Sequence, residues 1–594
     1  MYRFQTKLKF ILFGFIALLA NQGLHAVNAK PGLIKTQQPD GSTINILLVG
    51  DETDHYAISE EGYLLTSDEE GYYVLAELND AGIPVAIKER TAESSKLNDA
   101  QRKRLVRADE NSLLEISKRR ETEGKRSVRK APGRCTTDFP STGEQKAIVI
   151  LVEFANKKFQ LENPNEFYTR MLNEEGFSEV MCTGSARDFF LYNSDGKYQP
   201  TFDVYGPVQV SRNYSYYGGN DVWGNDARPN LMVTEACTLL DDQIDFKEYD
   251  RDGNGIIDNV YIFYAGFGEA DGGNSKTIWP HSANITDFSE EKFYFDGVLL
   301  DHYACSNEIQ ATTELPDGIG TFCHEFGHVL GLPDLYATFF FTNAFTPNTW
   351  DIMDRGSYNN MSRTPPNYSS YERYALGWLE PIELELGEVE LKPLGESKTA
   401  YIARTERDDE YFLFENRQKI GFDAYLPHHG MLVWHIDFYP RVWDGNMVNN
   451  TGSHQYVDLI EADDLRTYDS VEGDAFPGSA NITEFSNRTS PAFVDWSNNE
   501  MPFSISNIKE WEDGVITFNV ENPFAPGGSS EVNEIAEGDG LVVMNNVIYN
   551  KTGNVGIYDL GGRKVAESGI GNLQLPSGIY FAVKDGMRRK IIIK

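Results

Sequence analysis

The chain has 594 residues, of which 40% are hydrophobic and 12% aromatic, and its formal net charge is −37. One hydrophobic core rarely extends beyond about 250 residues, so this length predicts about three to five domains. The hydrophobic content excludes a wholly disordered chain. The acidity argues against a nucleic-acid-binding protein, because it would repel a phosphate backbone, and it is typical of a protein that works outside the cell.

The charge is divided unevenly along the chain. Residues 1–134 carry 20 basic and 19 acidic side chains, whereas residues 135–594 have a net charge of −38. Two regions of different composition therefore meet near Cys135. Within the first region, residues 88–134 hold 15 basic and 8 acidic side chains. We expect this basic segment to be open to proteases and to lie against the acidic remainder, covering its cleft.

Residues 1–29 have the layout of a secretory signal peptide. A basic start precedes the apolar run at 10–20, which is too short to span a membrane, and Ala26 and Ala29 offer cleavage points. An uncleaved N-terminal anchor is the alternative. No other apolar run reaches about 18 residues, so we expect no transmembrane helix.

Residues 30–134 are expected to form a pro-region. Residues 30–84 alternate apolar and polar positions around turns, which predicts a small β-rich unit. The basic linker that follows predicts removal of the pro-region by cleavage near Arg126, Arg129 or Arg134. The alternative is a solvated helix and linker that is never cut.

The segment GIGTFCHEFGHVLGLPDLY, residues 318–336, carries the strongest signal for chemistry. His324 and His328 are one helical turn apart, so both imidazoles point to one place. Glu325 lies between them and can take a proton from a metal-bound water. A glycine and a proline then end the helix, and the returning chain brings Asp334 back towards the histidines. We expect a zinc site with these three ligands and Glu325 as the catalytic base.

The pattern H-E-x-x-H-x-x-G-x-x-D has the metzincin layout, with aspartate in place of the usual third histidine. Downstream, WDIMDRGSY at 350–358 supplies Met353 as the candidate methionine turn below the metal. Tyr358 is a candidate for contact with the metal or the reacting carbonyl. Each residue has an ordinary alternative: Asp334 as a polar helix cap, Met353 as a core methionine and Tyr358 as a packing residue.

This segment resembles that of immune-inhibitor-A-type metallopeptidases, which are secreted bacterial zinc endopeptidases. The likeness covers roughly residues 135–520 and includes QKAIVILVEF (145–154), IWPHSAN (278–284), SSYERYALGWL (369–379) and GMLVWHIDF (430–438). The resemblance implies a two-lobed, metzincin-like catalytic domain followed by β-rich structure. It also implies the roles of the site residues: His324, His328 and Asp334 as zinc ligands, Glu325 as base and Met353 as turn residue.

The expected reaction is hydrolysis of peptide bonds in extracellular proteins. Glu325 would deprotonate a zinc-bound water for attack on the scissile carbonyl, and would then pass the proton to the leaving amine. The alternative from another class is a secreted adhesin or binding protein with an inactive peptidase fold, against which the intact glutamate argues. A zinc hydrolase of non-peptide amides also fits the motif.

A second cation site is predicted in DRDGNGIID, residues 250–258. Its acidic and amide side chains occupy positions 1, 3, 5 and 9 of a calcium-binding loop: Asp250, Asp252, Asn254 and Asp258. Position 12 is Tyr261 instead of glutamate, and a buried strand follows instead of a helix, so the motif is not an EF-hand. We expect a structural Ca²⁺ with a further ligand from elsewhere; a plain Asx/Gly turn is the alternative.

The five cysteines permit two disulfides in an exported protein: Cys135, Cys182, Cys237, Cys305 and Cys323. Their pairing cannot be read from the sequence. Cys135 is expected in a disulfide, with ligation of zinc in a latent form as the alternative, and Cys323 is expected to pack within the zinc helix. The remaining histidines lack ligand spacing, although His281 could line the cleft. The acidic stretches 461–464 and 472–474 are expected to be solvated.

The predicted fold class is α+β, with the peptidase domain at 135–380. Short strands with turn signals at 381–522 predict a β-sandwich, and residues 523–534 a linker. Residues 535–594 predict a last β module.

This last module resembles C-terminal sorting domains of bacterial type IX secretion. The residues that carry the likeness are VGIYD (555–559), GRKV (562–565) and PSGIY (576–580). The resemblance implies recognition by the secretion machinery, and release or attachment at the cell surface. An ordinary β-sandwich binding module is the alternative.

Overall fold

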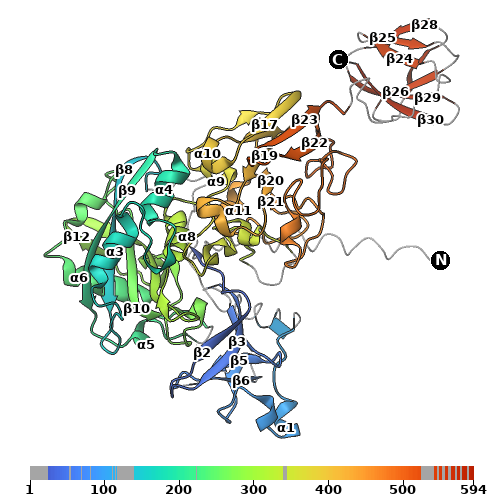
Figure 1. Cartoon of the computed structure of the whole chain (residues 1–594). Coiled ribbons are helices and arrows are strands. Elements are labelled where there is room, and N and C mark those ends of the chain that lie inside the picture. The colour runs from blue at the N-terminus through green and yellow to red at the C-terminus, as the bar shows by residue number, and fades with distance from the viewer. Residues whose placement is uncertain are drawn as a thin grey trace. The chain divides into compact units, whose positions relative to one another are not determined.

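The computed structural model describes residues 25–51, 55–68, 70–79, 82–109, 112, 113, 116, 139–221, 224–338 and 344–523, with seven strands between 541 and 593. The predicted cleavage residues, Cys135 and most of the leader lie outside the described residues. The chain divides into two compact units, residues 1–521 and 522–594, which are taken separately (Figure 1). In the described residues, no helix has the length and apolarity needed to cross a membrane.

The predicted β-rich unit of the pro-region is a six-stranded antiparallel sheet, drawn in blue in Figure 1. Its strands pair in chain order: β2 (Leu33–Gln37), β3 (Thr43–Gly50), β4 (His55–Ser59), β5 (Leu64–Ser67), β6 (Tyr73–Leu78) and β7 (Pro84–Ala86). Burial alternates along β2, with Ile34 and Thr36 inside, as the two-residue period predicts. The short helix α1 (Asp99–Arg102) follows, and Asn98 caps it.

The central sheet of the first unit has seven strands in the order β1-β11-β14-β10-β8-β9, with β15 paired to β14. The strands are β1 (His25–Ala26), β8 (Gly143–Glu153), β9 (Tyr198–Gln209), β10 (Val260–Phe267), β11 (His281–Asn284), β14 (His302–Gln310) and β15 (Leu315–Pro316). Strands β14, β10, β8 and β9 are parallel, and β11 is antiparallel to β14. Strand β10 confirms the buried strand predicted after the acidic loop.

Helices connect the parallel strands, because a parallel pair needs a crossover. Between β8 and β9 lie α3 (Pro164–Asn173) and α4 (Ala186–Ser194), and between β9 and β10 lie α5 (Tyr214–Tyr217) and α6 (Pro229–Leu240). Between β11 and β14 the chain forms α7 (Ile285–Phe288) and the hairpin of β12 (Phe293–Phe295) and β13 (Val298–Leu300).

Two hydrophobic cores lie on opposite sides of the central sheet. Val149 and Leu151 of β8 belong to one core, and Ile148 and Ile150 to the other. The first core also contains residues of α3, α4 and α8 (Ile319–Val329), and the second contains residues of α6. The central sheet therefore holds α8, the helix with the H-E-x-x-H motif, on one of its faces.

The strand-rich part after residue 380 contains two sheets. One has the strands β16 (Ile382–Glu383), β18 (Tyr401–Arg404), β19 (Glu410–Arg417), β20 (Gly430–Asp437) and β21 (Val457–Leu459), and the other has β17 (Gly387–Leu391), β22 (Ser504–Glu510) and β23 (Ile516–Glu521). Three short helices also occur here or just before: α9 (Ser370–Ala375), α10 (Leu394–Ser397) and α11 (Pro440–Asp444).

Strand β19 links two cores. Phe412 and Phe414 enter a core shared by both of these sheets, whereas Leu413 enters the core that contains α8. The strand-rich part is therefore packed directly on the preceding region.

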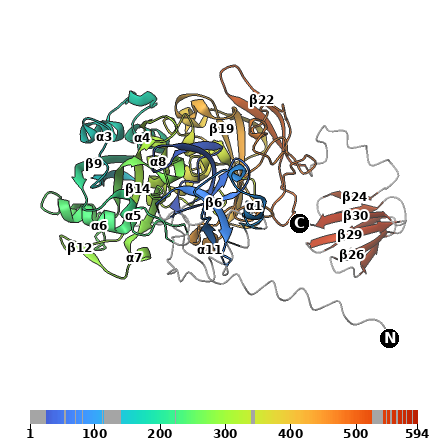
Figure 2. The same cartoon turned by 90° about the horizontal axis from the view of Figure 1, so that it is seen from below.

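The second unit contains two sheets in its described strands, β24-β25-β28 and β27-β26-β29-β30. Their bounds are β24 (Leu541–Met544), β25 (Val547–Asn550), β26 (Val555–Asp559), β27 (Lys564–Ser568), β28 (Gly571–Gln574), β29 (Gly578–Lys584) and β30 (Met587–Ile593). Figure 2 shows β26, β29 and β30 side by side, in agreement with their antiparallel pairing. The described strands of this unit thus form two antiparallel sheets.

The expectation of two disulfides is wrong. The four described cysteines are free and buried: Cys182, Cys237, Cys305 and Cys323. Cys182 and Cys323 lie in the core that contains α8. Cys237 and Cys305 lie in the core on the other face of the central sheet. All four pack as small apolar side chains, and Cys323 lies within the zinc-motif helix as predicted.

The acidic stretches after residue 460 are only partly solvated, which corrects the expected solvated loop. Glu461 and Asp474 are buried, at 2% and 1% exposure. Arg466 pairs with Glu461 at 3.3 Å, and the indole of Trp350 donates to Asp474 at 3.0 Å. Burial raises the pKa of Asp474 to about 8. Polar partners within the fold hold these carboxylates inside the protein.

Candidate metal centre

Glycines let α8 approach its neighbours closely. A Cβ on Gly320 would lie 2.1 Å from the carbonyl oxygen of Ser357, and the amide of Gly320 donates to Ser362 at 2.7 Å. The helix ends as predicted at Gly331, which has a φ of 96°, a left-handed conformation that glycine accepts without strain. The chain then turns back towards the helix.

The turn brings three ligand atoms together. His324 Nε2 and His328 Nε2 are 3.2 Å apart, and each lies 3.2 Å from Asp334 Oδ1. The two Nδ1 atoms face carbonyl oxygens, of Ile352 at 2.7 Å and of Leu332 at 2.8 Å. A carbonyl only accepts, so each Nδ1 carries the proton and each Nε2 is left as an electron-pair donor.

The donor set fits a zinc ion. At zinc bonds of about 2.0–2.1 Å, neighbouring ligands of a tetrahedral site lie about 3.3 Å apart, close to the separations seen here. The three side chains are buried, at 0%, 7% and 0% exposure for His324, His328 and Asp334. Burial alone would lower the pKa of His324, but the carboxylates of Asp334 and Glu325 raise it to about 9. The pocket therefore favours positive charge.

Asn446 holds Asp334 in place. Its side-chain amide donates to Asp334 Oδ2 at 2.6 Å, and its Oδ1 accepts the backbone N–H of Asp334 at 2.8 Å. Asn446 is 2% exposed and follows α11 in the strand-rich part. The sequence analysis missed this residue, because a lone asparagine over a hundred residues from the motif carries no pattern.

Glu325 lies on the same helix and is fully buried. Burial raises its pKa well above the ordinary range for glutamate. Its Oε1 accepts a hydrogen bond from the backbone N–H of Val27 at 3.0 Å. The carboxylate that the sequence predicts as catalytic base thus faces a segment from the start of the chain.

That segment, residues 25–30, passes over the site and is named the N-terminal segment below. Strand β1 extends the edge of the sheet, with Ala26 opposite His281 in antiparallel register. The indole of Trp279 donates to the carbonyl of Val27 at 3.0 Å, and the hydroxyl of Tyr358 donates to the carbonyl of Asn28 at 2.6 Å. Tyr358 therefore binds the backbone of this segment.

In the described residues, the N-terminal segment lies at the site. Most of the second half of the basic segment 88–134, which we expected to cover the cleft, lies outside the described residues. An extended strand can satisfy the open hydrogen bonds of an edge strand, which charge alone cannot do. His281, considered for the cleft, is a buried structural residue whose ring bonds to Tyr303 at 2.7 Å and to the carbonyl of Trp279 at 2.6 Å.

Met353 lies against the middle of α8. It is fully buried, and a Cβ on Gly327 would come within 2.7 Å of its sulfur. The preceding residue, Ile352, supplies the carbonyl that orients His324. The structure thus places the methionine beside the helix that carries the cluster.

The acidic loop brings three of its four predicted ligands together. Carboxylate oxygens of Asp250, Asp252 and Asp258 all lie within 4.8 Å of one another. The amide of Asn254, the fourth, bonds to Asp252 at 3.1 Å. Backbone N–H groups also enter the loop, with Gly255 donating to Asp250 at 3.0 Å.

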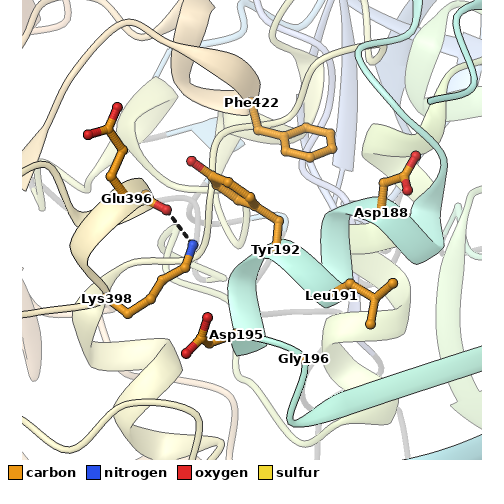
Figure 3. A pocket seen from close by; sticks show the side chains of 9 residues that line it. Asp188, Leu191, Tyr192, Asp195, Gly196, Glu396, Lys398 and Phe422 are labelled. Carbon is orange, nitrogen blue, oxygen red and sulfur yellow. Dashed lines mark hydrogen bonds between the residues drawn. The ribbon is translucent and has the colours of Figure 1, made fainter. Parts of the chain in front are cut away.

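A separate pocket lies beside α4 and α10 and contains none of these site residues (Figure 3). Lys398 lies over the ring of Tyr192, 3.7 Å from its centroid, and donates to the carbonyl of Gly395. Burial lowers the pKa of Lys398 to about 8. The ammonium group of Lys398 is therefore already engaged by the ring of Tyr192 and the carbonyl of Gly395.

Comparison with known proteins agrees with this geometry. Residues 135–379 match the family model described as the immune inhibitor A peptidase M6 catalytic domain. This part of the chain is therefore similar to the catalytic domain of a metallopeptidase.

Two curated relatives extend the comparison. The pre-pro-metalloprotease PrtV of Vibrio cholerae serotype O1 (strain M66-2) is 26% identical over 294 residues, which cover 42% of this chain and 32% of that protein. Immune inhibitor A of Bacillus thuringiensis subsp. alesti is 26% identical over 267 residues, 38% of each chain. The match thus spans about a third of the length of each relative.

Proposed function

We propose that the protein is a secreted zinc endopeptidase with a metzincin-like catalytic domain and a β-sandwich at 381–522. The observation that carries the proposal is the buried cluster of two imidazole nitrogens and one carboxylate oxygen beside Glu325. The match of residues 135–379 to a metallopeptidase domain supports it. Proteins and peptides outside the cell are the proposed substrates.

The proposed chemistry divides between the metal and the protein. His324, His328 and Asp334 would hold zinc, which when bound lowers the pKa of a water and polarises a carbonyl. Glu325 takes the proton of the attacking water and delivers it to the leaving amine. The edge strand β11 can pair with an extended substrate, as it pairs with β1 here.

We further propose that the chain is made as an inactive precursor. The N-terminal segment lies where a substrate would have to approach Glu325, so it excludes substrate. Activity then requires displacement of the N-terminal segment, whose last residue, Lys30, begins the predicted pro-region. Arg126, Arg129 and Arg134 are the cleavage points that the sequence predicts.

Substitution of the base tests the enzymatic proposal. Chain whose pro-region has been removed should digest casein when loaded with zinc, and a chelator should abolish this. Glu325→Gln should lower the rate at least about 100-fold, because it removes the group that moves the proton. Glu290→Gln, an exposed acid, is the matched control.

Two outcomes contradict this proposal. Equal rates for wild type and Glu325→Gln would remove the glutamate from the mechanism. A processed, zinc-loaded wild type as inert as the variant would favour the adhesin or binding protein with an inactive peptidase fold.

We propose that the acidic loop binds a structural Ca²⁺ through Asp250, Asp252, Asp258 and Asn254, because its three carboxylates converge. Calcium at 100 times its Kd should then stabilise the folded chain by about 2.7 kcal/mol, which thermal unfolding measures. Asp252→Ala should abolish the shift, and Asp242→Ala, a nearby exposed acid, should retain it. A melting temperature indifferent to calcium would contradict the site.

The C-terminal unit is proposed to be a sorting module for type IX secretion. Its β-sheets and the short motifs within them support this reading. The secretion machinery would be its partner, and the cell surface or medium the destination of the mature protein.

A further inference from the structure

The N-terminal segment marks the path of a substrate through the site. In the proposed reaction Glu325 gives its proton to the leaving nitrogen of the scissile bond. The amide nitrogen of Val27 stands 3.0 Å from Glu325 Oε1, where that leaving nitrogen would be. Val27 therefore takes the place of the first residue after the scissile bond, and Lys30 that of the fourth.

Lys30 enters a buried acidic pocket. Its ammonium lies 2.7 Å from Asp271 Oδ1 and 2.6 Å from the hydroxyl of Thr312. The side chains of Lys30 and Asp271 are only 14% and 8% exposed. The backbone N–H of Lys30 also donates to the carbonyl of Ala270, at 3.1 Å, which fixes the register of the segment beside the pocket.

A second carboxylate belongs to the same pocket. Asp317 is 7% exposed, and its Oδ2 accepts from the hydroxyl of Thr321 at 2.9 Å. Its Oδ1 is buried and has no hydrogen-bond partner among the described residues. Burial and the neighbouring Asp271 raise the pKa of Asp317 to about 7, and Lys30 opposes that rise.

A second cation, Arg363, also acts on the pair: it opposes the rise that burial causes in the pKa of Asp271. The guanidinium of Arg363 donates to the carbonyls of Met361 and Pro316 and to the hydroxyl of Thr313.

When the pro-region leaves, Lys30 leaves with it, and two buried carboxylates lose its ammonium. Asp271 then keeps the hydrogen bond from the backbone N–H of Ala311, at 2.9 Å, and Asp317 keeps that from Thr321. Neutral donors balance a buried negative charge less well than a cation does, so the emptied pocket attracts a new positive group.

We infer that Asp271 and Asp317 form a specificity subsite that binds the lysine or arginine side chain of the fourth substrate residue after the scissile bond. The inference rests on the proposed peptidase function. Because the chain's own lysine fills the pocket, the ligand class is a primary ammonium or a guanidinium on an extended peptide.

The first test uses the full chain and needs no activity. Lys30→Ala should raise the rate of amide hydrogen exchange at Val27 and Ala29 at least about tenfold, because a buried charge pair that anchors the segment is lost. Lys35→Ala, an exposed lysine on β2 of the same region, should leave these rates unchanged. Equal rates of amide hydrogen exchange at Val27 and Ala29 in the two variants would contradict the anchoring of the segment by Lys30.

The second test measures specificity of the processed, zinc-loaded enzyme. Two peptides are compared that differ only in lysine or norleucine at the fourth position after a mapped cleavage site. Wild type should cleave the lysine peptide with a kcat/KM about tenfold higher than the norleucine peptide, because norleucine cannot form the buried charge pair. Asp271→Asn and Asp317→Asn should each reduce that preference, and Glu290→Gln, an exposed acid, should keep it.

The outcomes separate the inference from the function it rests on. Cleavage of both peptides with equal kcat/KM overturns the subsite while the enzyme stands. Failure to cleave either peptide above the level of Glu325→Gln overturns the proposed function, and hydrogen exchange still decides whether the pocket binds a lysine.

Discussion

At the scale of single residues, the site depends on backbone carbonyls as much as on the ligands. The carbonyls of Ile352 and Leu332 fix the protonated nitrogen of each imidazole. The helical spacing of His324 and His328 could be predicted from sequence, because the period of the helix dictates it. The carbonyl partners could not, because any residue supplies the same backbone group.

Asn446 offers a test of this support. Its φ is 51°, a left-handed conformation, so Asn446→Gly removes both hydrogen bonds to Asp334 without backbone strain. The ligand should then lose its fixed orientation, and zinc affinity should fall about 10–100-fold, as measured by competition with a chelator.

A matched substitution controls for the glycine itself. Asn481 is exposed and has a φ of 53°, so Asn481→Gly makes the same chemical change far from any ligand. Zinc affinity in Asn446→Gly equal to that in Asn481→Gly would show that Asp334 needs no such support.

At the scale of elements, α8 is held by close backbone contacts at two glycines, which could not be predicted from its sequence. A Cβ on Gly318 would lie 2.1 Å from the carbonyl oxygen of Ser362, and Gly320 meets Ser357 at the same separation. The two glycines let the helix touch the chain that follows Met353. The motif predicts a helix and a methionine turn, but their packing depends on glycines that look ordinary in sequence.

Strands were predictable where one face is buried. The period-two pattern at 30–84 predicted a sheet that is present, and the apolar run after the acidic loop predicted β10. Pairing between distant strands was not predictable, because hydrogen bonds of the backbone leave no mark on composition. The pairing of β1 with the edge strand β11 was therefore not predicted. Strand β1 lies within the residues predicted to form the signal peptide.

Composition also misled where burial is decided by tertiary contacts. The count of cysteines allowed disulfides, but the described cysteines lie within hydrophobic cores on both sides of the central sheet. Glu461 and Asp474 read as solvated, yet an arginine and an indole hold them inside. Trp350 lies 124 residues from Asp474, too far in sequence to signal this contact.

At the scale of the whole molecule, the predicted domain boundary at residue 380 does not divide the hydrophobic core. Leu413, Leu432 and Trp434 from the later strands lie in the same core as Phe322 and Phe326 of α8. Asn446 crosses the same boundary to reach Asp334. Helix α8 and the strand-rich part therefore belong to one compact unit, in contrast to residues 522–594, which form a unit of their own.

Truncation separates these two boundaries and tests the sorting proposal. A chain that ends after Glu521 keeps the whole first unit, so it should unfold at the same temperature as the full chain and show the same proteolysis once processed. A chain that ends after Glu380 loses 13 of the 48 buried residues of a shared core and should not fold. Calorimetry measures the unfolding temperatures, and the casein assay measures the proteolysis.

In a host with type IX secretion, the chain ending after Glu521 should stay inside the cell while the full chain reaches the surface. Equal export of the two would contradict the sorting role and leave the terminal strands as an ordinary β module.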